Sequence, residues 1–467
     1  MFSMNHKSLE RYWWVYWLIS VLSMSVYWYL DSRPLVDLGR YYQSISDWWL
    51  WIERPTIQMF VGLLSQLGGW LNVLLAMGIW LVNDPEIVFM SYAVITSGLF
   101  WWGLRDAPIW TGIFLLMQPI WQVMWRTHWI HALETSMILI IWQSWRTERI
   151  TYWTGILTML VVWLRPSALI WLGLFLIWDC VRDTNSPSHH ILIGMVVGCL
   201  FISPQLSQYA SGKLAVPRIE WSVLDQIGRH GGWIPTLIMV LTVVWAHQIK
   251  NRDWIPLIWI GTGLALSLSF GVGIDNFPLV FTGLSLLAGR VFVFKSIGGV
   301  VVALAAIVHV LPFTEGVPSQ ARYFFHSNTI EDTPYDFQRP IRNVNGFIDP
   351  ISVQSVLKDL CKDNKPHCLV VTTGTLFHPH RESQGRLALL STELRHIRVE
   401  KAELWFRRNE QLKFVNVAIS QNCEANKNWL PKFRRFASEF ESHLQNWKTV
   451  DTIAIEDCKW RFIVPSQ

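Results

Sequence analysis

Apolar residues in the first two thirds of the chain are gathered in long blocks, separated by short segments that carry Arg, Lys and Asp. Most blocks approach the length of about 20 residues that an α-helix needs to cross a bilayer. The blocks are Tyr12–Leu30, Ile57–Val82, Ile87–Leu104, Ala107–Trp125, His131–Trp145, Ile150–Leu164, Pro166–Trp178, Ile191–Pro204, Trp233–Trp245, Trp254–Val272, Phe277–Gly289 and Ser296–Phe313. This pattern predicts a polytopic α-helical membrane protein with about 10–12 membrane segments.

The pattern changes after Phe313 to mixed charge and short alternating runs. Strands are predicted at Cys368–Thr372, Val415–Ile419 and Thr452–Ile455, and helices at Ile351–Leu360 and Trp429–Leu444. We therefore predict two domains. A transmembrane domain covers residues 1–313, with an outer-face loop at 31–56, and an extramembrane α/β domain covers residues 314–467.

The short loops that carry positive charge indicate the orientation, because Arg and Lys are retained on the cytoplasmic side. One alternating topology with a cytoplasmic N-terminus satisfies all of them: Arg105, Arg146 with Arg149, Arg182, Lys250 with Arg252, and Arg290 with Lys295. It places Asp275 with Asn276, and everything after Phe313, on the outer, periplasmic side. Ile57–Val82 must then begin and end outside, as a re-entrant hairpin or as interfacial helices, and Gly68 and Gly69 offer a place to break it.

Composition agrees with a membrane protein. The chain is 51% hydrophobic and only 16% charged, and many of its 30 Trp residues stand at the ends of the apolar blocks. Such residues form belts at the membrane interface, in contact with membrane lipids. The formal charge of +5 is spread over loops without a basic run, so we expect no nucleic-acid partner.

Four of the six cysteines fall in the C-terminal domain: Cys361, Cys368, Cys423 and Cys458. Four cysteines allow two disulfides with three pairings, which an oxidising compartment would favour. Free buried thiols are the alternative.

The first outer loop places a carboxylate beside a cation at the membrane surface. On a helix, Asp37, Arg40 and Tyr41 share a face through i+3 and i+4 spacings. This is a candidate site. The alternative is an amphipathic surface helix with Asp37 as its N-cap.

A second cluster lies at the outer end of an apolar block, where Arg126 is followed by His128, His131 and Glu134. The last three, at successive i+3 steps, lie on one side of a helix. Ionisable groups at membrane depth are costly unless they face a polar cavity, so we consider a substrate site and a hydrogen-bonded structural cluster. A divalent metal is weakly supported, because three ligands on one helix lack a partner motif.

Arg165-Pro166-Ser167 stands between two short apolar blocks. Pro166 can begin a helix, while Arg165 presents a planar fork suited to phosphate or else snorkels to the interface. The chain has no glycine-rich phosphate loop, serine nucleophile elbow, paired CxxC or His-rich zinc tract. ATP-driven pumps and the common hydrolases are therefore excluded, and no cofactor is predicted.

These elements, in this order, resemble the GT-C superfamily of integral-membrane glycosyltransferases, in its branch of protein mannosyltransferases and aminoarabinose transferases. The resemblance covers about residues 12–313 and rests on four stretches: Asp37 with Tyr41 and Tyr42, Arg54-Pro55 to Gly69, Met124 to Glu134, and Arg165 to Leu169. The chain has Asp37-Leu38 where the family usually has Asp-Glu, and Asn276-Phe277 where it often has Arg-Tyr.

The resemblance implies transfer of a sugar from a polyprenyl-phosphate donor to a lipid, glycan or protein acceptor at the outer face of the bacterial inner membrane. We expect inverting transfer with Asp37 as general base and Arg165 stabilising the leaving phosphate, aided by Arg126 or Arg40. His128, His131 and Glu134 would shape the sugar or acceptor pocket, together with Tyr41. The C-terminal domain would cover the site or recruit the acceptor.

Two other classes of function stay open. One is a non-catalytic membrane subunit or docking protein of a cell-envelope complex, in which Asp37 would be dispensable. The other is a transporter or flippase, which is disfavoured because transporters concentrate polar residues near the bilayer midplane.

Overall fold

The computed structural model describes the chain in segments. These are residues 9–29, 48, 51–52, 55–65, 68–82, 84–118, 120–121, 125, 130–147, 149–182, 189–211, 227, 233–245, 255–270, 273–291, 350–362, 368–372, 397–401, 415–423, 440–455 and 458–466. The predicted helix Ser296–Phe313 and the predicted domain boundary at residue 313 lie outside the described residues.

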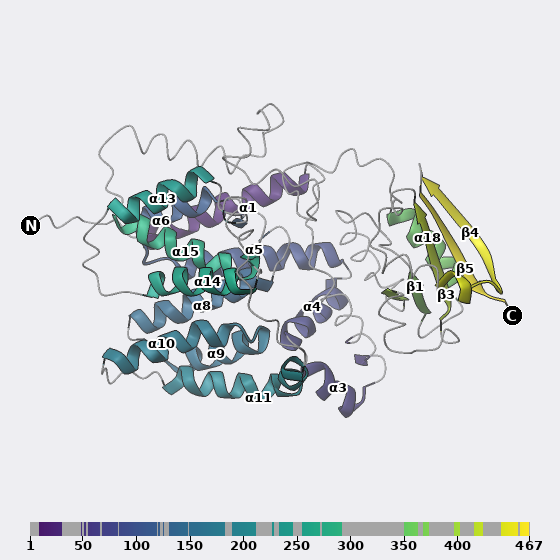
Figure 1. Cartoon of the computed structure of the whole chain (residues 1–467), viewed down its shortest axis with the longest axis horizontal. Helices are drawn as coiled ribbons and strands as arrows, with labels where there is room; N and C mark the ends of the chain where they lie inside the picture. The colour runs from purple at the N-terminus through teal and green to yellow at the C-terminus, as the bar shows by residue number, and fades with distance from the viewer. Residues whose placement is uncertain are drawn as a thin grey trace, which may run out of the picture. The chain divides into compact units, whose positions relative to one another are not determined.

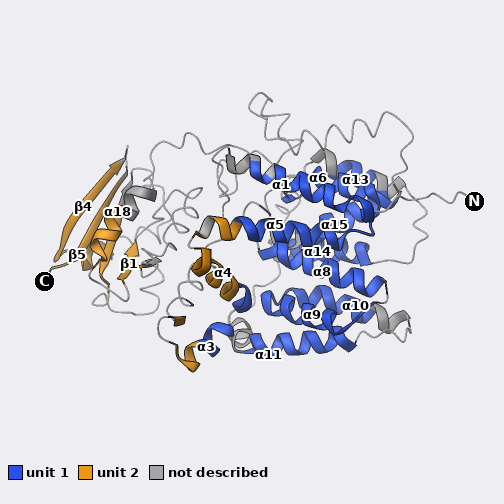
Figure 2. Cartoon of the chain, turned by 180° about the vertical axis from the view of Figure 1, so that it is seen from behind, with its two compact units in different colours: residues 1–34, 60–71, 90–340 blue, residues 35–59, 72–89, 341–467 orange. Residues whose placement is uncertain are grey.

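The chain divides into two compact units, drawn in separate colours in Figure 2. Unit 1 comprises Met1–Pro34, Phe60–Leu71 and Met90–Pro340, and unit 2 comprises Leu35–Met59, Asn72–Phe89 and Ile341–Gln467. The first unit is helical and the second carries a β-sheet.

Most helices follow the predicted apolar blocks closely, but the helix predicted over Ala107–Trp125 ends at Leu116. After a short 3-10 turn at Leu9–Arg11, they are α1 (Trp13–Tyr29), α3 (Ile57–Leu64), α4 (Gly69–Val82), α5 (Pro85–Gly103), α6 (Ile109–Leu116), α8 (Ile130–Arg146), α9 (Tyr152–Leu164), α10 (Ala168–Arg182), α11 (His189–Ser211), α13 (Trp233–Trp245), α14 (Ile255–Phe270) and α15 (Gly273–Val291). Among the described residues, no single helix is both long and apolar enough to cross a membrane, whereas α3 and α4 together could do so as a pair bent by 114°.

The break between α3 and α4 falls at the predicted glycines. Gly68 has a φ of 68°, in the left-handed region that favours glycine, and α4 begins at the next residue. The prediction that Gly68 and Gly69 interrupt the apolar block is confirmed.

Two further predicted helix ends are wrong. The helix expected to stop at Pro204 continues to Ser211, since a proline removes one backbone hydrogen bond without ending every helix. The helix expected from Phe277 begins at Gly273, so Asp275 and Asn276 already belong to it.

Helices α9 and α11 lie side by side, as do α14 and α15 (Figure 1). Glycines allow these close approaches. A Cβ added at Gly194 would lie 2.3 Å from the carbonyl oxygen of Gly155, and one at Gly283 would lie 2.6 Å from that of Pro256. Close backbone contact through small residues is typical of helix packing in membranes.

Unit 2 contains a five-stranded sheet with the order β2-β1-β3-β5-β4. Its strands are β1 (Cys368–Thr372), β2 (Ile397–Lys401), β3 (Val417–Cys423), β4 (Trp447–Ile455) and β5 (Cys458–Pro465), and α18 (Pro350–Leu360) precedes them. Strands β2, β1 and β3 are parallel, while β5 is antiparallel to both β3 and β4. The predicted α/β character of the C-terminal region is confirmed.

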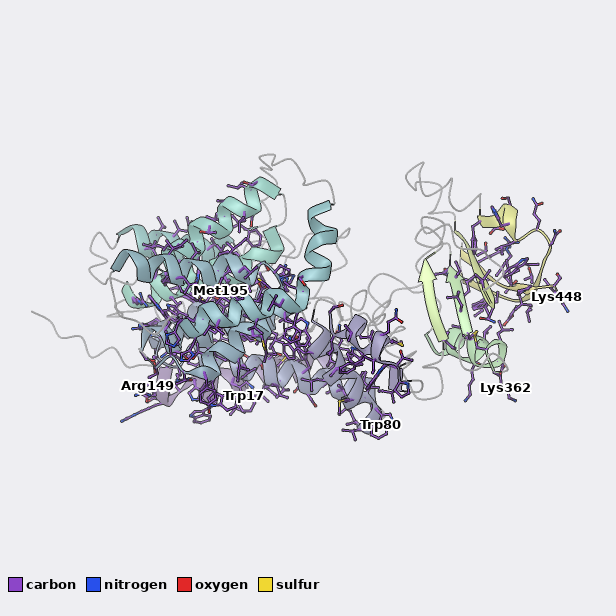
Figure 3. All side chains as sticks on the ribbon, turned by 90° about the horizontal axis from the view of Figure 1, so that it is seen from below. Trp17, Trp80, Arg149, Met195, Lys362 and Lys448 are labelled. Atoms are coloured by element: carbon purple, nitrogen blue, oxygen red, sulfur yellow. A yellow bond between two sulfur atoms is a disulfide. The ribbon has the colours of Figure 1, made fainter. Side chains whose placement is uncertain are left out.

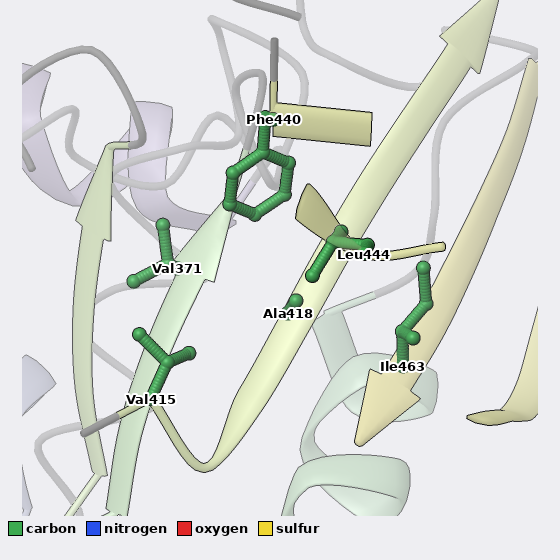
Figure 4. Close-up of a cluster of buried hydrophobic side chains, with 6 residues drawn as sticks. All are labelled: Val371, Val415, Ala418, Phe440, Leu444 and Ile463. Carbon is green, nitrogen blue, oxygen red and sulfur yellow. The ribbon is translucent and has the colours of Figure 1, made fainter. Parts of the chain in front are cut away.

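One face of this sheet is closed by the helical residues that begin at Phe440. Figure 4 shows the buried cluster there, formed by Val371, Val415, Ala418, Phe440, Leu444 and Ile463. The remainder of the helix predicted at Trp429–Leu444 lies outside the described residues.

Two predicted strand starts are corrected. Strand β3 begins at Val417 rather than Val415, because the backbone and side chain of Asn416 both bond to Leu369 and form an irregular start to the pairing. Strand β4 begins at Trp447 rather than Thr452. It lies at the sheet edge with residues such as Lys448 exposed (Figure 3), so its first half lacks the alternation of a half-buried strand.

A disulfide joins Cys361 to Cys368 with a Cα–Cα distance of 5.5 Å. It ties the residue after α18 to the first residue of β1. Of the two alternatives left open for the C-terminal cysteines, disulfides or free buried thiols, the disulfide holds for this pair.

Candidate functional site

Three of the predicted site residues meet in unit 1. His131 and Glu134 lie in the first turns of α8, and Arg165 is the C-cap residue of α9. The side chain of Arg165 contacts both of the others. The remaining predicted site residues lie outside the described residues: Asp37, Arg40, Tyr41, Arg126 and His128.

The centre of the cluster is an ion pair between Glu134 and Arg165. Arg165 Nη1 donates to Glu134 Oε2 at 2.6 Å, and the side chains of Arg165 and Glu134 are only 12% and 4% exposed, respectively. The other carboxylate oxygen, Oε1, accepts a 2.8 Å hydrogen bond from the hydroxyl of Ser167. Both oxygens of this buried carboxylate are therefore bonded, as a charge in such a place requires.

His131 completes the cluster from one turn of α8 earlier. Its Nδ1 contacts Arg165 Nη1 and lies 3.7 Å from Glu134 Oε2. A guanidinium can only donate, so Nδ1 is the acceptor in this contact.

The local sequence explains how Arg165 and Ser167 come to the same place. Arg165 leaves α9 with extended backbone angles of φ −152° and ψ 127°, as is favoured before a proline. Pro166 then begins a turn in which Ala168 N–H bonds to Arg165 O and Ile170 N–H bonds to Ser167 O. The tight turn leaves Arg165 and Ser167, two residues apart, both within reach of Glu134.

The break between α3 and α4 packs beside the cluster. A Cβ added at Gly68 would lie 3.4 Å from the side chain of Leu164 and 3.7 Å from that of Ile130. These two residues immediately precede Arg165 and His131. The interrupted helix therefore touches the two segments that carry the cluster.

Three hydrogen bonds hold this break against α9. The amide of Gly68 donates to the carbonyl of Trp163 at 2.9 Å, and the indole of Trp163 donates to the carbonyl of Leu64 at 2.8 Å. The indole of Trp70 reaches the carbonyl of Leu160 at 3.1 Å. The indole of Trp163 thus bonds a backbone carbonyl at the last residue of α3, where the helix itself supplies no partner.

Sequence reasoning named the motif that contains Ser167 but gave this residue no role. The available signal for such a role was that Ser167 carries a hydroxyl two positions after Arg165. The contacts of Trp163 and Trp70 had no signal beyond the abundance of tryptophan near interfaces. Both depend on how α3, α4 and α9 pack.

The cluster has the donors to bind an anion or sugar hydroxyls, and its fit to a metal is poor. Glu134 is already neutralised by Arg165, and a divalent cation would have to displace a guanidinium from it. Within the described segments, no group of three His, Cys, Asp or Glu side chains could hold a metal ion.

No family model matches the chain, and no curated protein matches it. Two crystal structures of ArnT from Cupriavidus metallidurans do match, one bound to undecaprenyl phosphate and one in the apo state. Each has a TM-score of 0.50, with 13% and 12% sequence identity, and in each case 96% of this chain and 96% of that chain are covered.

The chain has the fold of ArnT. This likeness in fold agrees with the resemblance predicted from the sequence. The likeness to ArnT extends over nearly the whole chain, whereas the residues quoted for the resemblance covered only the helical part.

Proposed function

We propose that this chain is an integral-membrane glycosyltransferase that takes its sugar from a polyprenyl-phosphate donor. The observation that carries the proposal is the ArnT fold over 96% of both chains, in a comparison where one ArnT structure is bound to undecaprenyl phosphate. Such a lipid phosphate needs a cation near the membrane surface, and the cluster around Arg165 supplies one.

In this proposal Arg165 stabilises the negative charge that develops on the departing phosphate. A guanidinium fork matches phosphate oxygens, and a donor fixed in advance stabilises developing charge without reorganising. Glu134 and Ser167 hold the fork in place, because one oxygen of the carboxylate binds Arg165 and the other binds the Ser167 hydroxyl. His131 and Glu134 would also line the sugar or acceptor pocket.

Asp37 is the proposed general base. It would take a proton from an acceptor hydroxyl or amine, which then attacks the sugar carbon from the side opposite the phosphate and inverts it. Arg40, Tyr41, Arg126 and His128 are proposed to bind the substrates. A lipid, a glycan or a protein is proposed as the acceptor.

The proposed setting is the bacterial inner membrane, with about 10–12 segments crossing it, a cytoplasmic N-terminus and residues 314–467 on the periplasmic side. Large apolar side chains on several helices support an apolar solvent, for example Leu22 at 63%, Ile177 at 63% and Leu200 at 67% exposed. The disulfide between Cys361 and Cys368 supports an oxidising compartment for the C-terminal domain.

The first experiment compares Asp37→Asn with wild type in membranes that contain a labelled polyprenyl-phosphate sugar pool, at matched protein abundance. Asp47→Asn in the same stretch of sequence is the control. We expect loss of transfer in Asp37→Asn, by at least about 100-fold as for a missing general base, and normal transfer in the control. Equal transfer in all three would remove Asp37 from the mechanism.

The second experiment tests the cation. Arg165→Lys retains the charge but loses the planar fork, and Arg149→Lys makes the same exchange outside the cluster. We expect reduced transfer only for Arg165→Lys. Absence of transfer by the wild-type chain over a panel of lipid-linked sugars would instead favour a non-catalytic docking subunit.

A further inference from the structure

Two of the four C-terminal cysteines occupy directly opposite positions in the strand register of the sheet. Cys423 is the last residue of β3, Cys458 is the first residue of β5, and the antiparallel pairing of these strands places the two directly opposite each other. The other two, Cys361 and Cys368, are already joined.

The backbone spacing at such a position suits a disulfide. Residues directly opposite each other in an antiparallel ladder have Cα atoms about 4.5 or about 5.5 Å apart, depending on the hydrogen-bond pattern. Disulfide-bonded cysteines usually have Cα atoms about 4.4–6.8 Å apart, so both kinds of pair fall inside the range. The Cys361–Cys368 bridge has a value of 5.5 Å.

Register also places three of the four cysteines, Cys368, Cys423 and Cys458, on one face of the sheet. Val370 pairs with Val417, and residues two apart on a strand share a face, so Cys368 and Cys423 belong to the same face. Cys458 belongs to it as well, through its pairing with Cys423. This is the face opposite the one that carries Ala418 and Ile463 in the cluster with Phe440.

We propose that Cys423 and Cys458 form a second disulfide of the C-terminal sheet. The two thiols lose two protons and two electrons to the disulfide of a thiol–disulfide exchange protein, which leaves as a dithiol, and a sulfur–sulfur bond forms between the cysteines. The bridge fixes the end of β3 to β5 at the point where the chain leaves the sheet after Cys423. It restricts the unfolded chain between residues 423 and 458. It does not depend on the proposed sugar transfer.

Peptide mapping of the full chain tests this bridge directly. The protein is purified from membranes in detergent with N-ethylmaleimide present throughout, and is digested with trypsin without reduction. Cys423 lies in the peptide 414–427 and Cys458 in the peptide 449–459, and each peptide contains one cysteine. We expect both in a single linked species, with the summed mass less two hydrogen atoms, which disappears on reduction.

The Cys361–Cys368 bridge is the internal reference, because its linked peptides 359–362 and 363–381 report whether the sheet was oxidised and protected from reduction. Peptides 414–427 and 449–459 recovered separately with N-ethylmaleimide attached would overturn the proposal. So would a species that joins either of them to a different cysteine.

The variant Cys423→Ser adds a check that does not need the linked peptide to be seen. Cys458 should change from unreactive to N-ethylmaleimide-reactive, while the Cys361–Cys368 species remains. If Cys458 is equally reactive in wild type and variant, no bond to Cys423 exists and the proposal is wrong.

Discussion

Glu134 and Arg165 stand 31 residues apart in sequence, at the start of α8 and the end of α9, and form a buried ion pair of 2.6 Å. The remaining carboxylate oxygen is bonded to Ser167, which follows Arg165 by two residues. One carboxylate therefore joins two helices and the turn that begins a third. We expect the stability of this part of the chain, as well as its proposed chemistry, to depend on the pair.

Removing both partners together should destabilise the protein by less than the sum of the two single removals. Glu134→Gln leaves a buried guanidinium without its anion, which costs about 3–5 kcal/mol. Arg165→Met leaves a buried carboxylate without its cation, at a similar cost. The double variant removes both charges, so its loss should be smaller than the sum by about 2 kcal/mol or more. Thermal unfolding of the four proteins in detergent gives the cycle, and additive effects would contradict the pairing.

Ser167→Ala should cost about 1 kcal/mol, because the hydroxyl bonds a carboxylate rather than a neutral group. Ser144→Ala is a matched control, since Ser144 lies on α8 and its hydroxyl donates to the carbonyl of Ile140 within the same helix. It should change stability by less than about 0.5 kcal/mol. Unfolding curves of the two variants, collected side by side, compare their losses in the free energy of unfolding. Equal effects would indicate that the bond to Glu134 contributes nothing specific.

Two glycines, Gly194 in α11 and Gly173 in α10, should respond in opposite ways to substitution by alanine. Gly194→Ala would place a Cβ 2.3 Å from the carbonyl oxygen of Gly155, and such overpacking typically costs about 1–3 kcal/mol. Gly173 in α10 has nothing within 4 Å of the added atom, so Gly173→Ala should stabilise the helix by about 0.5–1 kcal/mol. The melting temperatures should therefore move in opposite directions. A lower melting temperature for Gly173→Ala would show that this helix is packed differently.

The helices were largely predictable because their apolar blocks are long and bounded by polar residues. The block from Tyr12 to Leu30 became α1 (Trp13–Tyr29), and the break at Gly68 was foreseen because glycines interrupt an apolar run. Prediction was wrong where a single residue was given too much weight, as at Pro204, which α11 passes through. The start of β4 was missed because Lys448, Thr449 and Val450 are all exposed at the sheet edge.

The candidate site was predictable only in part. His131 and Glu134 were grouped by their i+3 spacing, which is a local property of a helix. The partner of Glu134 was not predictable, since Arg165 could equally have reached solvent or lipid headgroups. Its position depends on the packing of α8 against α9 and on the turn at Pro166, neither of which is encoded in a local pattern.

Trp163 should control the local stability of the break between α3 and α4. Trp163→Phe retains a ring to stack on Phe201, 4.4 Å away, but removes the N–H that bonds the carbonyl of Leu64. The amide of Gly68, which donates to the Trp163 carbonyl, should then exchange with deuterium several-fold faster, since a loss of about 1 kcal/mol in a local opening raises exchange by that order.

Trp153→Phe is the control for this measurement. Trp153 lies on the same helix but is 64% exposed, and the substitution should leave exchange in residues 64–70 unchanged. Hydrogen exchange followed by mass spectrometry on the peptide that covers this stretch compares the variants. Faster exchange in both, or in neither, would mean that the indole of Trp163 does not hold the break. Faster exchange in Trp163→Phe alone would show that a single side chain fastens the interrupted helix beside Leu164 and Arg165.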